Sequence, residues 1–335
     1  MQLKFSFIIP VYNRPEEIDE LLESFVELQV NSISYEIVIV EDGSTVTSKD
    51  VIKKYNSKLN VSYFFKENSG PGDSRNFGMH QAQGNYFIIL DSDCILSEDY
   101  LVEVIKSLNE DFVDCYGGPD AAHDSFSNLQ KAINFTMTSF ITTGGIRGNK
   151  KRVDTFQPRS FNMGISKEAF LASKGFGNIH PGEDPDLSIR LLKLGFKTKL
   201  IPTAVVYHKR RISWSKFYKQ VYKFGLVRPI LNVWHPETKK ITYWFPTVFT
   251  LGLIVSLFLL IFKIKWLLVF YIIYFIVAFF TALISTKNIE VAILSMVAIG
   301  CQFIGYGFGF IKSTFIVQLL KKEPEYYFPD LFFKS

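Results

Sequence analysis

Short apolar runs alternate with segments of helical spacing along the first third of the chain. The runs are rich in β-branched and aromatic residues, which is typical of buried strands, and they occupy residues 5–9, 36–40, 61–65 and 85–90. Between the first two runs, residues 15–29 repeat apolar side chains every three or four positions, as an amphipathic helix does. Such alternation predicts an α/β fold, with a mostly parallel sheet and helices on both of its faces.

Polar loops follow three of these strands, at residues 10–14, 41–44 and 91–93. The carboxyl ends of parallel strands share one edge of a sheet, and ligands of open α/β sheets bind there. Asp91 and Asp93 therefore face a predicted ligand crevice. Mg²⁺ and Mn²⁺ prefer oxygen ligands and are commonly shared between carboxylates and phosphates, so this pair suits a nucleotide diphosphate. Taken by itself, the tripeptide Asp91-Ser92-Asp93, a D-x-D pattern, can also be interpreted as a solvated turn.

Apolar residues are concentrated toward the end of the chain. Of the 335 residues, 48% are hydrophobic, which is enough for a globular core and something more. Three almost entirely apolar runs, each close to the roughly 20 residues that cross a bilayer, occupy residues 245–262, 266–285 and 291–311. We expect two or three transmembrane helices within 241–335, with three buried helices of a soluble domain as the alternative.

A basic stretch precedes these runs. Residues 203–240 hold nine Lys or Arg residues and one acid, Glu237. Such an excess beside a membrane segment marks the cytoplasmic side and favours anionic headgroups, so we expect membrane lipids and no nucleic acid as partners. From Trp214 onward, aromatic and basic side chains fall on different helical faces, which predicts an interfacial amphipathic helix within 213–240. Residues 1–212 would then form a domain on the cytoplasmic side of the inner membrane.

Four segments together resemble the ordered motifs of family 2 glycosyltransferases, which are inverting enzymes of the GT-A fold. The resemblance spans residues 3 to about 230, and its motifs lie at 8–13, 40–44, 70–78 and 90–93. It implies a nucleotide-binding half at about 1–110 and an acceptor half at about 111–212.

The resemblance also implies roles for individual side chains. Asp42 and Arg75 would contact the uracil of a UDP-sugar. Asp91 and Asp93 would serve the ribose, the diphosphate and a Mg²⁺ or Mn²⁺ ion. The nucleotide pocket would further include, from the same motifs, Pro10, Tyr12, Asn13 and Ser92.

A second carboxylate pair, Glu183 and Asp184, opens a segment whose leucines recur at helical spacing. Asp is favoured at the N-cap and Pro at the first helical position, so Asp184 before Pro185 can be explained as a helix cap. The pair also resembles the family's ED motif. By that resemblance Asp184 is the general base, because displacement at an anomeric carbon requires the acceptor hydroxyl to lose its proton.

Two further positions depend on the same resemblance. His208 follows the apolar strand 204–207, and a histidine at such a strand end is often structural. In similar GT-A enzymes a histidine at this place joins the D-x-D motif on the metal, so both interpretations stay open. Asn162 lies in segment 161–166, which in the family lines the acceptor side together with the ED pair.

Residues 220–224 look like a softened form of the Q-x-x-R-W motif of processive polysaccharide synthases. Lys223 stands where the motif has Arg, and Lys lacks the forked guanidinium. Phe224 stands where it has Trp, and Phe lacks the indole donor. This disfavours processive synthesis and leaves Gln220 and Lys223 a role near the acceptor or the diphosphate.

We therefore predict a membrane-bound inverting glycosyltransferase that moves a sugar from a UDP-sugar to a lipid-linked or membrane-proximal glycan acceptor. A processive polysaccharide synthase is the alternative within the enzyme class. A catalytically inactive membrane scaffold with the same fold is the second alternative, and the presence of Asp91, Asp93 and Asp184 argues against it.

Overall fold

The computed structural model describes residues 2–29, 33–121, 126–143, 156–208 and 213–333. Contacts between residues divide the chain into two compact units. The first unit contains residues 1–123, 150–209 and 332–335, and the second contains residues 124–149 and 210–331. The chain thus changes unit after residues 123, 149, 209 and 331.

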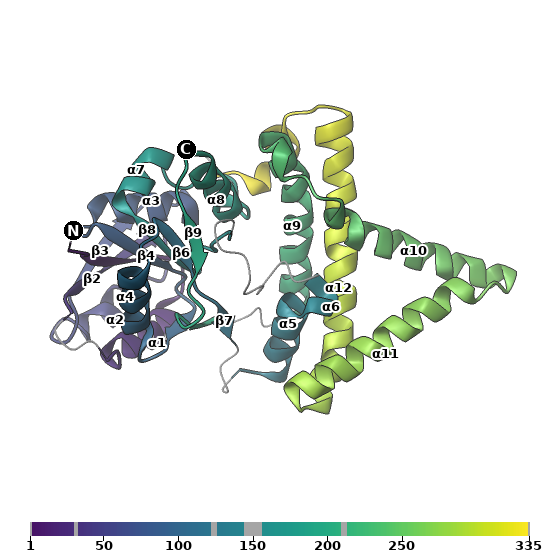
Figure 1. Ribbon diagram of the computed structural model, residues 1–335, viewed down its shortest axis with the longest axis horizontal. Coiled ribbons are helices and arrows are strands. Elements are labelled where there is room, and N and C mark those ends of the chain that lie inside the picture. Colours follow the sequence, from purple (N-terminus) through teal and green to yellow (C-terminus); the bar gives the residue numbers. More distant parts are fainter. Residues whose placement is uncertain (1, 30–32, 122–125, 144–155, 209–212, 334–335) are drawn as a thin grey trace. The chain divides into compact units, whose positions relative to one another are not determined.

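The first unit is built on a seven-stranded sheet in the order β3-β2-β1-β4-β8-β6-β9 (Figure 1). Its strands are β1 (Phe5–Val11), β2 (Tyr35–Asp42), β3 (Val61–Lys66), β4 (Tyr86–Leu90), β6 (Cys115–Gly117), β8 (Asn162–Ser166) and β9 (Thr198–Leu200). β8 is antiparallel to both of its neighbours, whereas the other pairs in the sheet are parallel. The expected mostly parallel sheet is confirmed.

Helices cover both faces of this sheet, as expected. One face packs against α1 (Pro15–Val26), α2 (Lys49–Lys53) and α4 (Tyr100–Glu110). The other packs against α3 (Pro71–Gln81), α7 (Lys167–Ser173) and α8 (Glu183–Lys193). Successive side chains of a strand point to opposite faces, so Phe7 and Ile9 of β1 enter the first core and Ile8 enters the second. This explains why the strand is apolar at every position instead of alternating.

A small second sheet joins three distant segments in the order β5-β10-β7. Its strands are β5 (Cys94–Leu96), β7 (Asp120–Ala121) and β10 (Val206–His208). In the antiparallel β5–β10 pair, Cys94 stands opposite His208. The sheet therefore carries His208 to the end of the 91–93 loop.

The second unit is helical. Its α-helices are α5 (Asn128–Thr138), α6 (Phe140–Thr143), α9 (Trp214–Trp234), α10 (Phe245–Leu259), α11 (Trp266–Thr286), α12 (Ile289–Ser313) and α13 (Pro324–Tyr327). Shorter helical turns are η1 (Pro236–Thr238), η2 (Ile241–Trp244), η3 (Leu260–Phe262), η4 (Thr314–Leu319) and η5 (Pro329–Leu331). Three stretches are long and apolar enough to cross a membrane, and they agree with the three expected runs: Ile241–Phe262, Trp266–Thr286 and Ile289–Leu319.

The predicted interfacial helix is present as α9, and its place at a membrane interface stays a prediction. Part of its apolar face packs inside the second unit. Phe217 and Val221 are buried in one cluster with Ile133 of α5 and Ala298 of α12. An apolar stripe suits a lipid interface or a neighbouring helix equally well, and here the neighbouring helices supply the matching surface.

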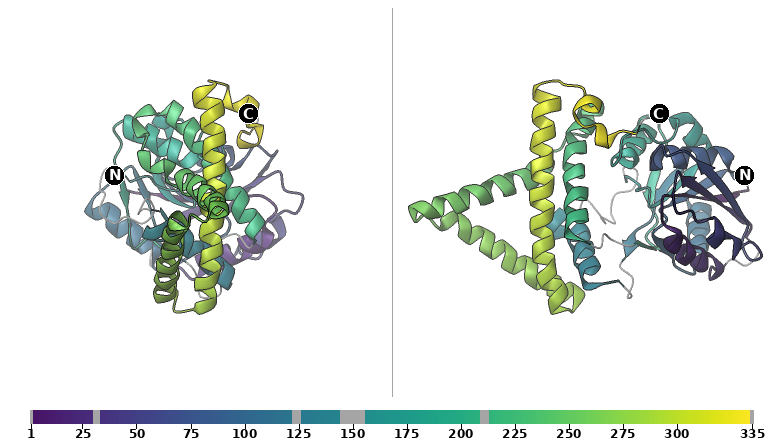
Figure 2. Two further views of the ribbon diagram at one scale, coloured as in Figure 1. Left: turned by 90° about the vertical axis from the view of Figure 1, so that its right-hand side faces the viewer. Right: turned by 180° about the vertical axis from the view of Figure 1, so that it is seen from behind.

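Glycines allow α9 and α12 to lie side by side at very short range (Figures 1 and 2). A Cβ atom at Gly225 of α9 would lie 2.2 Å from the carbonyl oxygen of Tyr306. A Cβ atom at Gly309 of α12 would lie 2.3 Å from the carbonyl oxygen of Tyr222. Both obstacles are backbone atoms of the partner helix, so a side chain at either position forces the helices apart.

We expect Gly309→Ala to destabilise the second unit by about 1–3 kcal/mol, the usual cost of overpacking. The matched control is Gly300→Ala in the same helix, because nothing lies within 4 Å of a Cβ atom there. Tryptophan fluorescence during thermal unfolding reports this unit selectively, since Trp214, Trp234, Trp244 and Trp266 are the only tryptophans. Equal unfolding midpoints for the two variants would contradict the close packing.

Candidate active site

The loops after β1, β2 and β4 meet at one edge of the large sheet. Asn13 adopts a positive φ of 53°, and its Oδ1 accepts hydrogen bonds from the backbone N–H groups of Thr45 and Val46, each at 2.9 Å. Arg14 donates from Nη1 to Oδ2 of Asp93 at 2.7 Å. The first contact joins the β1 and β2 loops, and the second joins the β1 loop to the D-x-D segment.

Asp42 fastens the start of α3. Its buried carboxylate accepts from Nζ of Lys66 at 2.8 Å and from the backbone N–H groups of Ser69 and Gly70, each at 3.0 Å. Nearby, Pro10 is buried within β1, whereas Tyr12 lies just beyond the strand with 51% of its surface exposed. Tyr12 is thus the accessible member of this group.

Arg75 connects the two carboxylate motifs. Its side chain is only 3% exposed, and it donates from Nη2 to Oδ1 of Asp91 at 2.7 Å and from Nη1 to Oε1 of Glu183 at 3.0 Å. His180 approaches the same Oε1 through Nδ1 at 2.9 Å. Burial by itself raises the pKa of Glu183, but His180 and Arg75 outweigh that effect and lower it to about 2. Glu183 is therefore a buried carboxylate whose ionised form is stabilised by Arg75 and His180.

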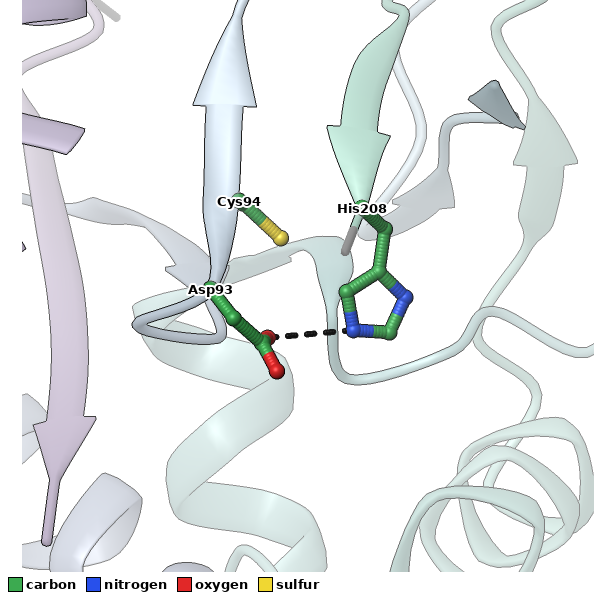
Figure 3. Close-up of side chains that lie close together, drawn as sticks. All are labelled: Asp93, Cys94 and His208. Carbon is green, nitrogen blue, oxygen red and sulfur yellow. Dashed lines mark ion pairs between the residues drawn. The ribbon is translucent and has the colours of Figure 1, made fainter. Parts of the chain in front are cut away.

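Asp93 and His208 face each other with 3.1 Å between Oδ1 and Nε2 (Figure 3). Together with Sγ of Cys94, the potential ligand atoms of these residues lie within 4.8 Å of one another. The His208 ring is fixed by stacking on Phe161, with the ring centroids 5.0 Å apart. A carboxylate and an imidazole are ligands that Mn²⁺ accepts, so the donor set fits the expected divalent cation.

Cys94 is a weaker candidate for that site. Burial raises the pKa of its thiol well above the usual range, and the charges of Asp93 and Asp91 raise it further. The thiol also donates to the carbonyl oxygen of Phe161 at 3.4 Å. A protonated thiol is a poor ligand for a hard cation, so Asp93 and His208 are the stronger candidates.

Asp184 is not a helix cap. α8 begins at Glu183 after Gly182, which occupies the N-cap position with a φ of 124°. Asp184 is thus the second helical residue, two positions beyond the N-cap, which excludes the cap interpretation. Its Oδ2 lies 3.5 Å from Nη1 of Arg159, and its side chain is partly exposed. The helix start holds this carboxylate next to Glu183, at the end of the Arg75 network.

The amide of Asn162 is taken up by partners inside the first unit, and its expected place on the acceptor side stays a prediction. It is fully buried; its Oδ1 accepts from the hydroxyl of Tyr100 at 2.6 Å, and its Nδ2 donates to the carbonyl of Ala204 at 2.8 Å. Both ends of the amide thus hold the core together.

The other predicted site residues divide between the units. Ser92 is buried between the two aspartates of the D-x-D segment. Gln220 and Lys223 lie on α9 in the second unit, where Lys223 donates from Nζ to the carbonyl oxygen of Asp330 at 3.1 Å. Their role near the acceptor or the diphosphate stays a prediction.

Sequence reasoning did not single out four basic residues of the site: Arg14, Lys66, Arg159 and His180. Arg14 directly follows the first motif and His180 lies three residues before Glu183, so proximity to a motif was a usable signal for these two. Lys66 and Arg159 lie far from their partners in the sequence, and only the fold brings them together.

Comparison with known proteins identifies the family. The sequence model described as Glycosyl transferase family 2 matches residues 6–171. Over 110 residues the chain is 34% identical to the poly(ribitol-phosphate) beta-N-acetylglucosaminyltransferase TarS of Staphylococcus aureus, a match that covers 32% of this chain and 19% of that protein. The match thus spans about a fifth of the length of this curated relative.

Two solved structures share the fold. One is S. aureus TarS 1–349 in complex with UDP-GlcNAc, with a TM-score of 0.50 and 20% identity over 68% of this chain and 67% of that one. The other is the mannosyltransferase PcManGT of Pyrobaculum calidifontis in complex with GDP-Man and Mn²⁺, with a TM-score of 0.57 and 15% identity over 96% of this chain and 89% of that one. The chain belongs to glycosyltransferase family 2, and its first unit has the GT-A fold.

We expect Arg75→Met to destabilise the first unit by about 3–5 kcal/mol, because it removes the cation that Asp91 and the buried Glu183 share and leaves His180 as the partner of Glu183. Adding Glu183→Gln should recover part of this loss. In a Cys301→Ser background, Cys94 and Cys115 are the remaining cysteines, and both are buried in the first unit. The rate at which a thiol reagent labels these two cysteines at increasing urea concentrations therefore measures the unfolding of this unit. If Arg75→Met alone were as stable as the parent protein, the Arg75 network would not contribute to the stability of this unit.

Proposed function

We propose that this protein is a membrane-bound inverting glycosyltransferase, which takes a sugar from a UDP-sugar and transfers it to a lipid-linked or membrane-proximal glycan acceptor. The observation that carries the proposal is the link through Arg75 between Asp91 and Glu183. It joins the segment expected to hold the donor diphosphate to the segment expected to hold the base.

The donor would lie across the loops after β1, β2 and β4. Asn13, Asp42 and the exposed Tyr12 surround the place where the nucleoside is expected. UDP is the favoured nucleotide from the motifs, and the TarS neighbour was solved in complex with UDP-GlcNAc. The PcManGT neighbour was solved in complex with GDP-Man, so a donor panel must include a guanosine diphosphate sugar.

Asp184 would act as the general base. The acceptor oxygen forms its bond to the anomeric carbon while the bond from that carbon to the diphosphate breaks, and the hydroxyl proton passes to the carboxylate. Arg159, 3.5 Å away, orients this carboxylate. A single displacement by an activated hydroxyl inverts the anomeric configuration.

Asp93 and His208 would hold the metal, with Asp91 on the diphosphate side. When bound, a Mg²⁺ or Mn²⁺ ion supplies positive charge that stabilises the departing diphosphate. Arg14, paired with Asp93 at 2.7 Å, places a fixed positive charge at the same edge. Charges held in place before the reaction stabilise a developing anion without reorganising.

The second unit supports an acceptor at the membrane. It contains three helices long and apolar enough to span a bilayer, and the basic stretch 203–240 precedes them. That charge bias favours the cytoplasmic side for the catalytic unit. The acceptor would then be a glycan or lipid within reach of the membrane surface.

We expect Asp184→Asn to lower transfer by at least about 100-fold, the typical contribution of a general base, with UDP binding retained. The measurement is nucleotide release together with mass spectrometry of membrane lipids, using UDP-sugars, GDP-mannose and Mn²⁺. Asp111→Asn is the charge-matched control, because this exposed residue pairs only peripherally with Lys199 at 3.5 Å. Full activity of Asp184→Asn would refute the assigned base.

The product pattern of the parent protein distinguishes the alternatives in the same experiment. One added sugar mass supports single transfer, and a ladder of additions favours the processive synthase. No transfer and no nucleotide binding with any donor would favour the inactive scaffold.

We expect Asp93→Asn and His208→Ala each to weaken Mn²⁺ binding at least tenfold, since loss of even an outer partner of a metal ligand costs about 10–100-fold. Cys94→Ser is the matched control and should change affinity less than about threefold, because the buried thiol stays protonated. Electron paramagnetic resonance of free Mn²⁺ measures all three without turnover. A loss with Cys94→Ser equal to the other two would make the thiol a ligand.

A further inference from the structure

Two residues near the end of the chain return to the first unit. Phe332 forms an antiparallel bridge with Ile179, and the backbone N–H of Phe333 donates to the carbonyl oxygen of Asn178 at 3.1 Å. The preceding residues, up to Leu331, belong to the helical unit. We call Phe332 and Phe333 the return segment.

The ring of Phe333 lies between two loops that carry site residues. On one side is Gly70, where a Cβ atom would lie only 2.2 Å from the ring. Gly70 has a φ of 94° and donates its N–H to Asp42 at 3.0 Å. On the other side is His180, with the ring centroids 6.0 Å apart. The ring also borders a pocket of about 250 Å³ that is lined by Asp73, Asn76 and Phe176.

The loop under the return segment has little regular structure of its own. Residues 174–182 connect α7 to α8, and three of them, Lys174, Gly175 and Gly182, have positive φ angles. Asn76 holds one end of this loop through paired hydrogen bonds to the backbone of Phe176, at 2.8 and 2.9 Å. The bridge to Phe332 holds the middle, at Ile179.

This loop leads directly to the carboxylates. His180 contacts Glu183 at 2.9 Å, Glu183 pairs with Arg75, and Asp184 follows Glu183 at the start of α8. A displaced His180 loop would therefore move the helix start and the expected base with it. Errors of about 1 Å in such positions can cost about 100-fold in rate.

We propose that the return segment is a positioning element, which holds the His180 loop and thereby sets Asp184 for reaction. The inference rests on the proposed function, because it assigns Asp184 as the base. The inference gives a role to Phe333, which lies outside all of the sequence motifs. The return segment acts through contacts within the first unit.

The test compares Phe333→Ala, Phe333→Leu and Phe112→Ala in the full chain. Phe112 is the matched control, because its ring is 50% exposed in the same unit and lies outside the site. We expect Phe333→Ala to lower kcat at least tenfold while the Kd for UDP changes less than about threefold. Phe333→Leu keeps an apolar side chain over Gly70 and should restore most of the rate. Phe112→Ala should resemble the parent.

Hydrogen exchange supplies a readout that does not need turnover. Amide exchange across residues 176–183 should accelerate at least tenfold in Phe333→Ala and stay unchanged in Phe112→Ala. The positioning role is overturned if kcat is unchanged, if only the Kd for UDP rises, or if exchange in this segment is unaffected. If the parent itself transfers no sugar, the proposed function fails, and the exchange result still decides whether the return segment holds the loop.

Discussion

A buried guanidinium connects distant parts of the first unit. The Arg75 side chain is only 3% exposed, so water cannot solvate its charge. It needs anionic partners, because an unpaired buried charge would cost several kcal/mol. Its two anions come from opposite parts of the chain: Asp91 ends the central strand β4, and Glu183 begins α8. The pairing therefore ties the end of the central strand to the helix that carries Asp184. Glu183 provides that tie as a buried carboxylate whose pKa is lowered by His180 and Arg75.

A second arrangement of charges lies next to the first, on the same loop after β4. Asp93 is held by Arg14 on one oxygen and faces His208 on the other. The small β5-β10-β7 sheet brings His208 there from more than 100 residues away, and the stack on Phe161 fixes its ring. Each arrangement thus combines one buried carboxylate, Glu183 or Asp93, with at least one partly exposed partner.

The helical unit shows how one pattern can serve two environments. α10 and α11 are apolar around their whole circumference and leave most of that surface uncovered, as lipid-facing helices do. α9 has an apolar stripe beside a basic face, which is equally suited to a membrane interface. Its stripe is instead buried on α5 and α12, where glycines let the backbones approach closely.

The sequence by itself determined the strands, the covering helices and the three apolar spans, because each follows from local periodicity and composition. It also placed Asn13, Asp42, Asp91 and Asp93 at one edge, since parallel strands end together. Only the tertiary structure decided which side chains pair with one another and which are buried. Arg75 and Glu183 are 108 residues apart, Asp184 lies two residues beyond the N-cap of α8, and Asn162 is buried in the core. Long-range pairing and side-chain direction depend on packing between elements, which no local pattern encodes.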